Sequence, residues 1–329
     1  MLINDALRFS GINTYSKWLM KSGLHKEMYN FSYSTFAKQH YYVNMLKYFF
    51  SLKDIIKNSN ESVVHYTSIM PVAKTIISDL NKEVKQFMTV HDLFFIEYYF
   101  PKQTIFDHST IIILYYNFIT KAKIKGVHFI TGSDYIRKQL KKYFNVKADV
   151  VYEFIDNIIS EYKYENVLNK KENKIYILNV SDCNTRKNIE FRNHIERLFD
   201  NYTFVNVGCE LKNDNVINLK NIDDNMYYSI FRDIDYVFLP SFDEGFGIPF
   251  YEAMYFKKPV IAFNLPVYME LYPELKYARN NDDMIYMLKN LDEYSDNYID
   301  IYKKGYTHEK EYEKLRKIYG GEQNVKNIC

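Results

Sequence analysis

The chain of 329 residues has few cysteines and no long uninterrupted apolar run. Its three cysteines, Cys183, Cys209 and Cys329, are odd in number and widely separated. Their spacing predicts neither a metal site nor a disulfide framework, and it favours a reducing compartment. The longest apolar run, residues 111–119, is too short to span a bilayer and predicts a buried helix. The first five residues turn polar too early for a signal peptide, so we expect a cytoplasmic protein.

The chain also lacks short-period repeats and low-complexity tracts. Hydrophobic residues make up 47% of it and charged residues 26%, which is typical of a globular protein, and its length predicts two domains. The net charge of +2 is divided unevenly, because residues 1–150 are net basic and residues 151–329 net acidic. The basic half predicts an acidic partner, such as an anionic membrane surface or a phosphorylated acceptor. A basic surface without a partner is the alternative.

Short apolar segments alternate with helical patterns in both halves of the chain. The expected strands are 2–3, 63–66, 86–90, 127–131, 150–152, 174–180, 203–208, 216–219, 235–240 and 258–263. The expected helices are 12–21, 134–144 with Ser133 as its cap, 225–231 and 307–319. This alternation predicts two doubly wound α/β domains, residues 1–165 and 166–329, with a polar linker around 161–173. The last helix can pack back on the first domain.

The helix expected at 134–144 carries four cations and several apolar residues. One interpretation is that it docks the protein peripherally on an anionic membrane. The alternative is an ordinary amphipathic helix, with its apolar face in the core and a solvated basic face.

The most informative stretch is residues 241–252. Glu244 and Glu252 are eight positions apart, with Gly245, Gly247 and Pro249 between them. An apolar strand precedes them and a helix and strand follow, which predicts a strand–loop–helix joint at the carboxyl edge of a parallel sheet, where open α/β sheets bind ligands. The glycines permit a sharp turn, and the proline suits the first helical position. We place Glu244 in the loop and Glu252 in the first helical turn, where both can accept hydrogen bonds from sugar or ribose hydroxyls. A solvated loop beside an ordinary helix start is the alternative.

This stretch resembles the Glu-x7-Glu signature of retaining glycosyltransferases with the GT-B fold, specifically glycosyltransferase family 4. The matching residues are Ser241, Glu244, Gly245, Phe246, Gly247, Pro249, Glu252 and Ala253. The resemblance implies an α/β fold of two Rossmann-like doubly wound domains facing across a cleft, with the acceptor on the first and the nucleotide-sugar donor on the second. The chain departs from the family at 179–181, where Asn-Val-Ser replaces a common Val-Gly, and at 257–258, where two lysines stand in place of a glycine.

Three further segments of the chain match the family. Arg186 and Lys187 follow the first strand of the second half, and two adjacent cations at a sheet edge suit a diphosphate. The resemblance implies that they grip the diphosphate of the donor; a solvated basic pair is the alternative. His91, followed by Asp92, matches a His-Asp pair near the transferred sugar and the acceptor, although a structural histidine would also fit. Gly11 matches a glycine-containing loop that approaches the donor phosphates, and a plain turn is the alternative.

By resemblance, the protein is a retaining hexosyltransferase-type glycosyltransferase that uses a nucleotide-diphosphate sugar and a glycan, lipid or protein acceptor. Glu244, His91, Arg186 and Lys187 form the expected catalytic group. The expected donor-binding group is Gly11, Arg186, Lys187, Glu244, Gly245, Phe246, Gly247 and Glu252. Asp233 and Asp235 resemble the Asp-x-Asp metal motif of the other large glycosyltransferase fold, but they lead directly into a strand, so we expect no metal. We also expect no cofactor besides the donor and no nucleic-acid partner. A nucleotide-sugar epimerase or a non-catalytic GT-B-like binding or scaffold protein is the alternative.

Overall fold

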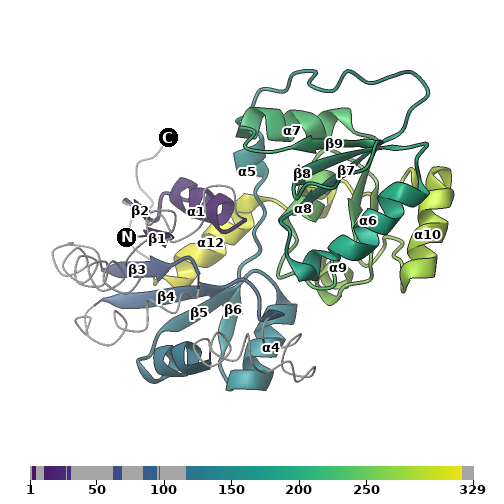
Figure 1. Ribbon diagram of the computed structural model, residues 1–329. Coiled ribbons are helices and arrows are strands. Elements are labelled where there is room, and N and C mark those ends of the chain that lie inside the picture. The colour runs from purple at the N-terminus through teal and green to yellow at the C-terminus, as the bar shows by residue number, and fades with distance from the viewer. Residues whose placement is uncertain are drawn as a thin grey trace, which may run out of the picture. The chain divides into compact units, whose positions relative to one another are not determined.

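A computed structural model describes residues 2–4, 11–26, 28–30, 62–68, 84–94, 96 and 116–320 (Figure 1). The contacts between residues divide the chain into two compact units. The first contains residues 1–155 and 308–329, and the second contains residues 156–307. Each unit has its own parallel sheet, which agrees with the α/β class predicted from the alternating pattern.

The first unit has a parallel sheet in the order β2-β1-β3-β4-β5-β6. Its strands are β1 (Leu2–Asn4), β2 (Met28–Asn30), β3 (Val63–Tyr66), β4 (Lys85–Val90), β5 (His128–Thr131) and β6 (Ala148–Val150). Its helices are α1 (Gly11–Lys21), α4 (Asp134–Phe144) and α12 (His308–Ile318), with a further helical segment at 116–124. The central strands are buried, as expected for a parallel sheet covered by helices.

Helix α4 begins and ends as the sequence predicts. The Ser133 hydroxyl accepts a hydrogen bond from the amide of Ile136 at 3.4 Å, and Asn145 ends the helix in the left-handed region with φ 50°. Ile136, Leu140 and Phe144 are buried in the core of the first unit. The apolar face of α4 is therefore part of that core. Of the run 111–119, residues 116–119 are helical with a buried end, and 111–115 lie outside the described residues.

The second unit has a parallel sheet in the order β11-β10-β7-β8-β9. Its strands are β7 (Tyr176–Ser181), β8 (Thr203–Gly208), β9 (Val216–Leu219), β10 (Tyr236–Leu239) and β11 (Val260–Ala262). Its helices are α5 (Asp156–Ile159), α6 (Ile189–Leu198), α7 (Asp224–Asp233), α8 (Ile248–Tyr255), α9 (Pro266–Leu271), α10 (Asn281–Lys289) and α11 (Ile301–Lys304). The chain order reverses between β7 and β10, so the switch point of this sheet lies there.

The boundary between the units lies at 155/156 rather than at the expected 165/166. The polar stretch expected as a linker is held by α7 through hydrogen bonds. The Tyr162 hydroxyl donates to Asp224 at 2.7 Å, and the amide of Val167 donates to Asp233 at 2.8 Å. Polarity alone predicted a solvated linker, but these groups are satisfied by helix carboxylates of the second unit.

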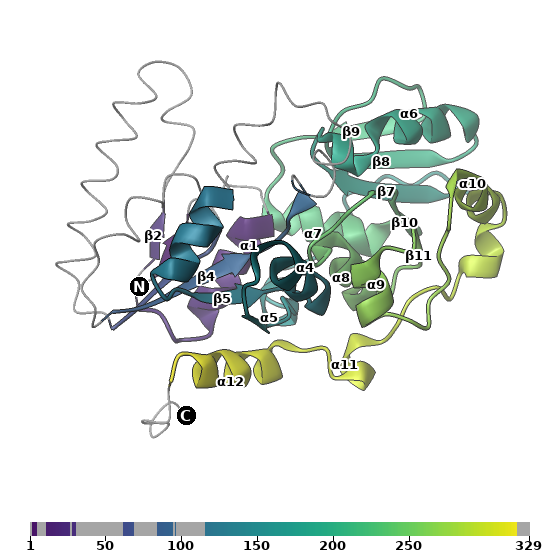
Figure 2. The same ribbon diagram turned by 90° about the horizontal axis from the view of Figure 1, so that it is seen from below.

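The last helix, α12, lies in the first unit although it comes last in the chain (Figure 1 and Figure 2). The Tyr312 hydroxyl donates to the carbonyl of Trp18 at 2.6 Å, and Glu311 accepts from the amide of Tyr152 at 2.9 Å. Residues 308–318 thus connect α1 to the segment that follows β6. None of the helices in the described ranges is both long enough and apolar enough to cross a bilayer.

The cysteine prediction is wrong, because Cys183 and Cys209 form a disulfide with their Cα atoms 5.0 Å apart. The two residues are 26 positions apart in sequence, yet each follows one of two neighbouring strands. Ser181 at the end of β7 pairs in register with Gly208 at the end of β8, so the residues after them meet. The inference of a reducing compartment depended on unpaired cysteines and loses that support. Cys329 lies outside the described residues.

Candidate functional site

The predicted strand–loop–helix joint follows β10, and α8 begins at Ile248. Gly247 caps this helix with φ 85°, and a Cβ atom there would lie 2.6 Å from the Tyr268 ring, so only glycine fits. Pro249 is the second helical residue rather than the first. Glu252 is the fifth, so it lies in the second turn and not in the first turn as predicted. Gly245 and Phe246 stand in the loop, as expected.

The structure brings Lys187 and Glu244 together. The Lys187 ammonium donates to Glu244 at 2.5 Å, and both side chains are about nine-tenths buried. Burial raises the pKa of Glu244, but the charges of Lys187 and Arg186 and hydrogen bonds from Lys187 and Ser241 outweigh it and hold the pKa below its usual value. Glu244 is therefore an ionised carboxylate whose oxygens accept hydrogen bonds at the carboxyl edge of the sheet.

Arg186 and Lys187 lie in a short 3₁₀ turn, residues 185–187, directly after β7. Asn184 caps this turn through the amide of Arg186 at 3.1 Å. The carbonyl of Arg186 accepts from the amide of Phe242 at 2.8 Å, in the loop that also carries Glu244. The loops after β7 and β10 are thus linked by a backbone hydrogen bond and by the ion pair. Three predicted site residues meet at the switch point of the sheet.

Glu252 is 1% exposed and accepts a hydrogen bond from the Tyr227 hydroxyl of α7 at 2.6 Å. Burial raises its pKa to about 7, against the hydrogen bonds from Tyr227 and Tyr228, which lower it. A hydroxyl-bearing ligand that donates to this carboxylate would favour its ionised form.

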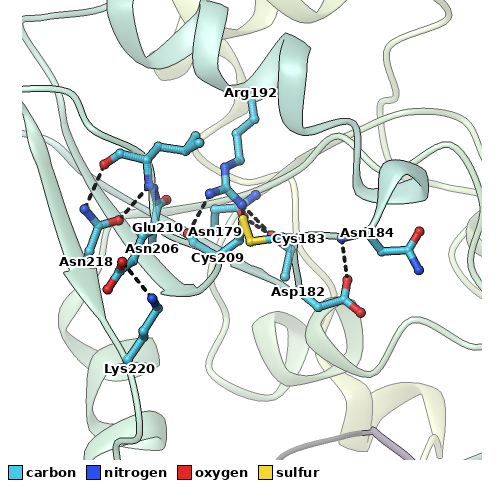
Figure 3. Close-up of a disulfide and its surroundings, with 12 residues drawn as sticks. Asn179, Asp182, Cys183, Asn184, Arg192, Asn206, Cys209, Glu210, Asn218 and Lys220 are labelled. Atoms are coloured by element: carbon cyan, nitrogen blue, oxygen red, sulfur yellow. Dashed lines mark hydrogen bonds and ion pairs between the residues drawn. A yellow bond between two sulfur atoms is a disulfide. The ribbon is translucent and has the colours of Figure 1, made fainter.

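A buried network supports the loop after β7 (Figure 3). Arg192 of α6 is fully buried and donates to Asn179 at 2.6 Å, to Ser181, and to the carbonyl of Cys209 at 2.8 Å. Its Nε atom lies 3.2 Å from Glu196. The Asn179 amide also donates to the carbonyl of Phe238 in β10 at 2.7 Å. Asn179 and Ser181, where the chain differs from the Val-Gly pair of the resemblance, therefore both bond the buried Arg192. The disulfide joins the same end of β7 to the end of β8.

An open pocket of about 450 Å³ lies at the carboxyl ends of β10 and β11. Its lining residues are Ser241, Phe242, Phe263, Asn264, Leu265, Arg279, Asn280, Asn281 and Asp282. Ser241 and Phe242 come from the loop that carries Glu244, so this space adjoins the joint and can receive part of a bound ligand.

His91 directly follows β4 in the first unit. Its Nδ1 atom lies 2.8 Å from Glu153, and its Nε2 atom lies 2.7 Å from the carbonyl oxygen of Thr67. Gly11 is the first residue of α1, and residues 5–10, which belong to the predicted loop, lie outside the described residues. Asp233 and Asp235 accept backbone hydrogen bonds from Val167 and Tyr176, so they have structural contacts at the helix–strand connection.

Sequence reasoning missed two residues that contact predicted site residues. Tyr227 bonds Glu252, and Glu153 lies beside His91. Tyr227 gave no signal, because it is one of 33 tyrosines. Glu153 did give one, because it stands alone among apolar residues directly after a predicted strand. A buried carboxylate in such a segment needs a cationic or hydrogen-bonding partner.

Comparisons with known proteins bear on the family and the fold of this chain. Residues 160–317 match the family described as Glycosyl transferases group 1. The O-antigen chain mannosyltransferase RfbU of Salmonella typhimurium is 28% identical over 256 residues, which cover 72% of this chain and 65% of that protein. The chain thus spans just under two thirds of that relative's length.

Two solved structures share the arrangement of elements. Sucrose-phosphate synthase from Thermosynechococcus elongatus aligns with a TM-score of 0.67 and 14% identity, covering 84% of this chain and 78% of that one. S. aureus TarM, in complex with fondaparinux, α-GlcNAc-glycerol and UDP, aligns with a TM-score of 0.61 and 18% identity, covering 84% and 59%. The chain therefore has the α/β GT-B fold of two Rossmann-like domains, and residues 160–317 of it match the glycosyl transferases group 1 family.

Proposed function

We propose that this protein is a retaining, metal-independent glycosyltransferase that moves a hexosyl group from a nucleotide-diphosphate sugar to a glycan acceptor. The buried Lys187–Glu244 pair at the switch point of the second sheet carries this proposal. It lies inside the segment that matches the glycosyl transferases group 1 family. A cation and an anion held together there suit a ligand that combines a diphosphate with sugar hydroxyls.

Each residue has a role that follows from its chemistry. The Lys187 ammonium has three N–H groups, so one can bond Glu244 while the others face the phosphates. Arg186 adds a guanidinium that suits two phosphate oxygens, and both cations offset the charge that develops on the leaving diphosphate. Glu244 and the backbone of 245–247 hold the sugar hydroxyls, and Glu252 holds the ribose. The chain's own cations supply the charge that a metal would otherwise provide.

The relative named a mannosyltransferase supports a mannosyl donor and a saccharide acceptor. The basic first half supports an anionic acceptor, and peripheral contact with an anionic membrane on the cytoplasmic side belongs to the same proposal.

A liposome experiment tests the membrane contact. We expect the protein to bind anionic liposomes at low salt and to lose this binding at high salt, because exposed charges are screened. Absence of binding at low salt would remove the membrane contact.

A thermal-shift screen against UDP-, GDP-, ADP- and dTDP-sugars tests the donor site. Ligand binding to the folded state raises the unfolding midpoint. We expect a shift with one nucleotide class, and its loss in Arg186→Ala and Glu252→Ala. Lys304→Ala, an exposed cation of α11 that does not line the neighbouring pocket, serves as the control for general loss of charge. Equal shifts in the site variants and the parent protein, or no shift with any class, would contradict the assignment. Retention is tested by NMR of the anomeric configuration in donor and product.

A further inference from the structure

Both ring nitrogens of His91 face oxygen atoms, and both of these oxygens can only accept hydrogen bonds when Glu153 is ionised. Nδ1 lies 2.8 Å from Oε1 of Glu153, and Nε2 lies 2.7 Å from the carbonyl oxygen of Thr67. A neutral imidazole has one N–H and one bare nitrogen, so it would place a lone pair against one of these oxygens. Only the doubly protonated ring donates to both, and Glu153 supplies the matching negative charge.

The surroundings of His91 favour its charged form. Burial by itself lowers the pKa of His91, but the charge of Glu153, the hydrogen bonds to Glu153 and Thr67, and the charge of Asp92 together raise it. Tyr15 meets the imidazole edge-on at a centroid distance of 4.9 Å, and His65 is a further titratable neighbour among the residues that the structure describes. Burial lowers the pKa of His65 well below its usual value, so this second imidazole is neutral near pH 7.

Glu153 is itself held in place on both sides. It is 2% exposed and lies in the extended segment after β6. The amide of Tyr152 donates to Glu311 of α12 at 2.9 Å, and the carbonyl of Phe154 accepts from the Trp18 indole of α1 at 2.8 Å. The backbone on both sides of Glu153 is therefore fixed by hydrogen bonds, and the carboxylate that it carries lies 2.8 Å from Nδ1 of His91.

We propose that Glu153 is a positioning residue that holds His91 as a fixed imidazolium at the carboxyl end of β4. His91 then offers a positive charge to an anionic group of the substrates and does not accept a proton from the acceptor. This proposal deepens the glycosyltransferase function proposed above and rests on it for the identity of the substrates. The ion pair itself is independent of that function.

Nitrogen-15 NMR of histidine-labelled protein tests the ion pair without any substrate, with His91→Gln used to assign the signals. In the parent protein at pH 7.5 we expect both ring nitrogens of His91 to be protonated. In Glu153→Gln, the His91 titration midpoint should fall by about one to three pH units. Asp92→Asn removes a nearby charge that makes no hydrogen bond to the ring, and it should lower the midpoint less. One protonated and one bare nitrogen in the parent protein at pH 7.5 would overturn the proposal, even if Glu153→Gln did not fold.

The dependence of sugar transfer on pH is the second readout, measured with whichever of GDP-mannose and UDP-N-acetylglucosamine the protein consumes. The Glu153→Gln variant should lose activity relative to the parent as the pH rises through its lowered His91 midpoint. A constant ratio of the two activities from pH 6 to 8 would overturn the positioning role, because a merely structural defect is independent of that titration. Absence of turnover by the parent protein would contradict the proposed function, and the NMR measurement would still decide the ion pair.

Discussion

The charge of Glu252 depends on its buried surroundings. Burial raises its pKa to about 7 in the folded protein, against about 4.3 for an ordinary glutamate. The folded state therefore holds the proton more tightly, and its stability relative to the unfolded chain decreases as the pH rises through 7. Glu252→Gln removes this titration. The free energy of unfolding of this variant minus that of the parent protein should therefore increase by about 2 to 3 kcal/mol from pH 5 to pH 8. Urea unfolding at both values measures the difference, and a difference that does not depend on pH would contradict it.

The buried ion pair makes a different prediction at the same scale. Lys187→Met leaves the Glu244 carboxylate buried without its closest cation, which should cost about 3 to 5 kcal/mol of stability. The double variant Lys187→Met/Glu244→Gln removes both charges and should recover most of that loss. The half-exposed pair Lys220–Glu210 provides the matched control, since Lys220→Met should cost less than about 1 kcal/mol. Additive losses in the double variant would show that the two side chains do not interact.

At the scale of elements, α4 depends on its cap. Ser133 satisfies the amide of Ile136, and its replacement by alanine should cost about 1 kcal/mol. Ser62→Ala, at an exposed serine directly before β3 in the same unit, should leave the stability nearly unchanged. Urea unfolding of both variants measures the contrast. Equal effects would mean that the Ser133 hydroxyl contributes nothing particular to α4.

Local sequence patterns predicted the exact bounds of some elements, but for others the predicted bounds are wrong by a few residues. The boundaries of α4 and of β8 agree with the prediction, because a cap, an amphipathic period and an apolar run mark them locally. β6 was expected at 150–152 but lies at 148–150. Its last pair with β5 joins Val150 to Thr131, after which the chain stays extended and buried without ladder pairing. The apolar sequence of a buried segment therefore predicted a strand, although no strand pairing continues beyond Val150 in the described part of the chain.

The signature and the sheet order together could predict the meeting of Lys187, Arg186 and Glu244, because both loops lie at carboxyl ends of parallel strands. The pairing of Cys183 with Cys209 and of His91 with Glu153 could not be predicted in this way. Each depends on which strands are neighbours and on their register, and residue spacing does not contain that information. Tyr227 reaches Glu252 from another helix, and nothing in the sequence distinguishes it from the other tyrosines.

At the scale of the whole molecule, the chain leaves the first unit at Ile155 and returns to it at His308. The contacts of Glu311 with Tyr152 and of Tyr312 with Trp18 belong to this returning segment. We expect residues 156–307 to fold alone with a cooperative thermal transition. Residues 1–155 should require 308–320, added as a peptide or joined by a linker, to give a transition of their own. Circular dichroism of the fragments measures both, and a stable, cooperative fragment 1–155 without 308–320 would contradict the expectation.

The buried arginine beside the disulfide limits how this chain can change. Ser181→Gly would introduce the glycine of the Val-Gly pair that the resemblance implies, but it would remove an acceptor from a guanidinium that has no access to water, as would Asn179→Val. Arg192→Leu made first would in turn leave Glu196 buried without its cation. Each single step is unfavourable although the final combination is compatible with the fold. The effects of substitutions at Asn179, Ser181, Arg192 and Glu196 therefore depend on one another. Residues from a homologue can replace them only as a set, which limits changes beside the loop that carries Arg186 and Lys187.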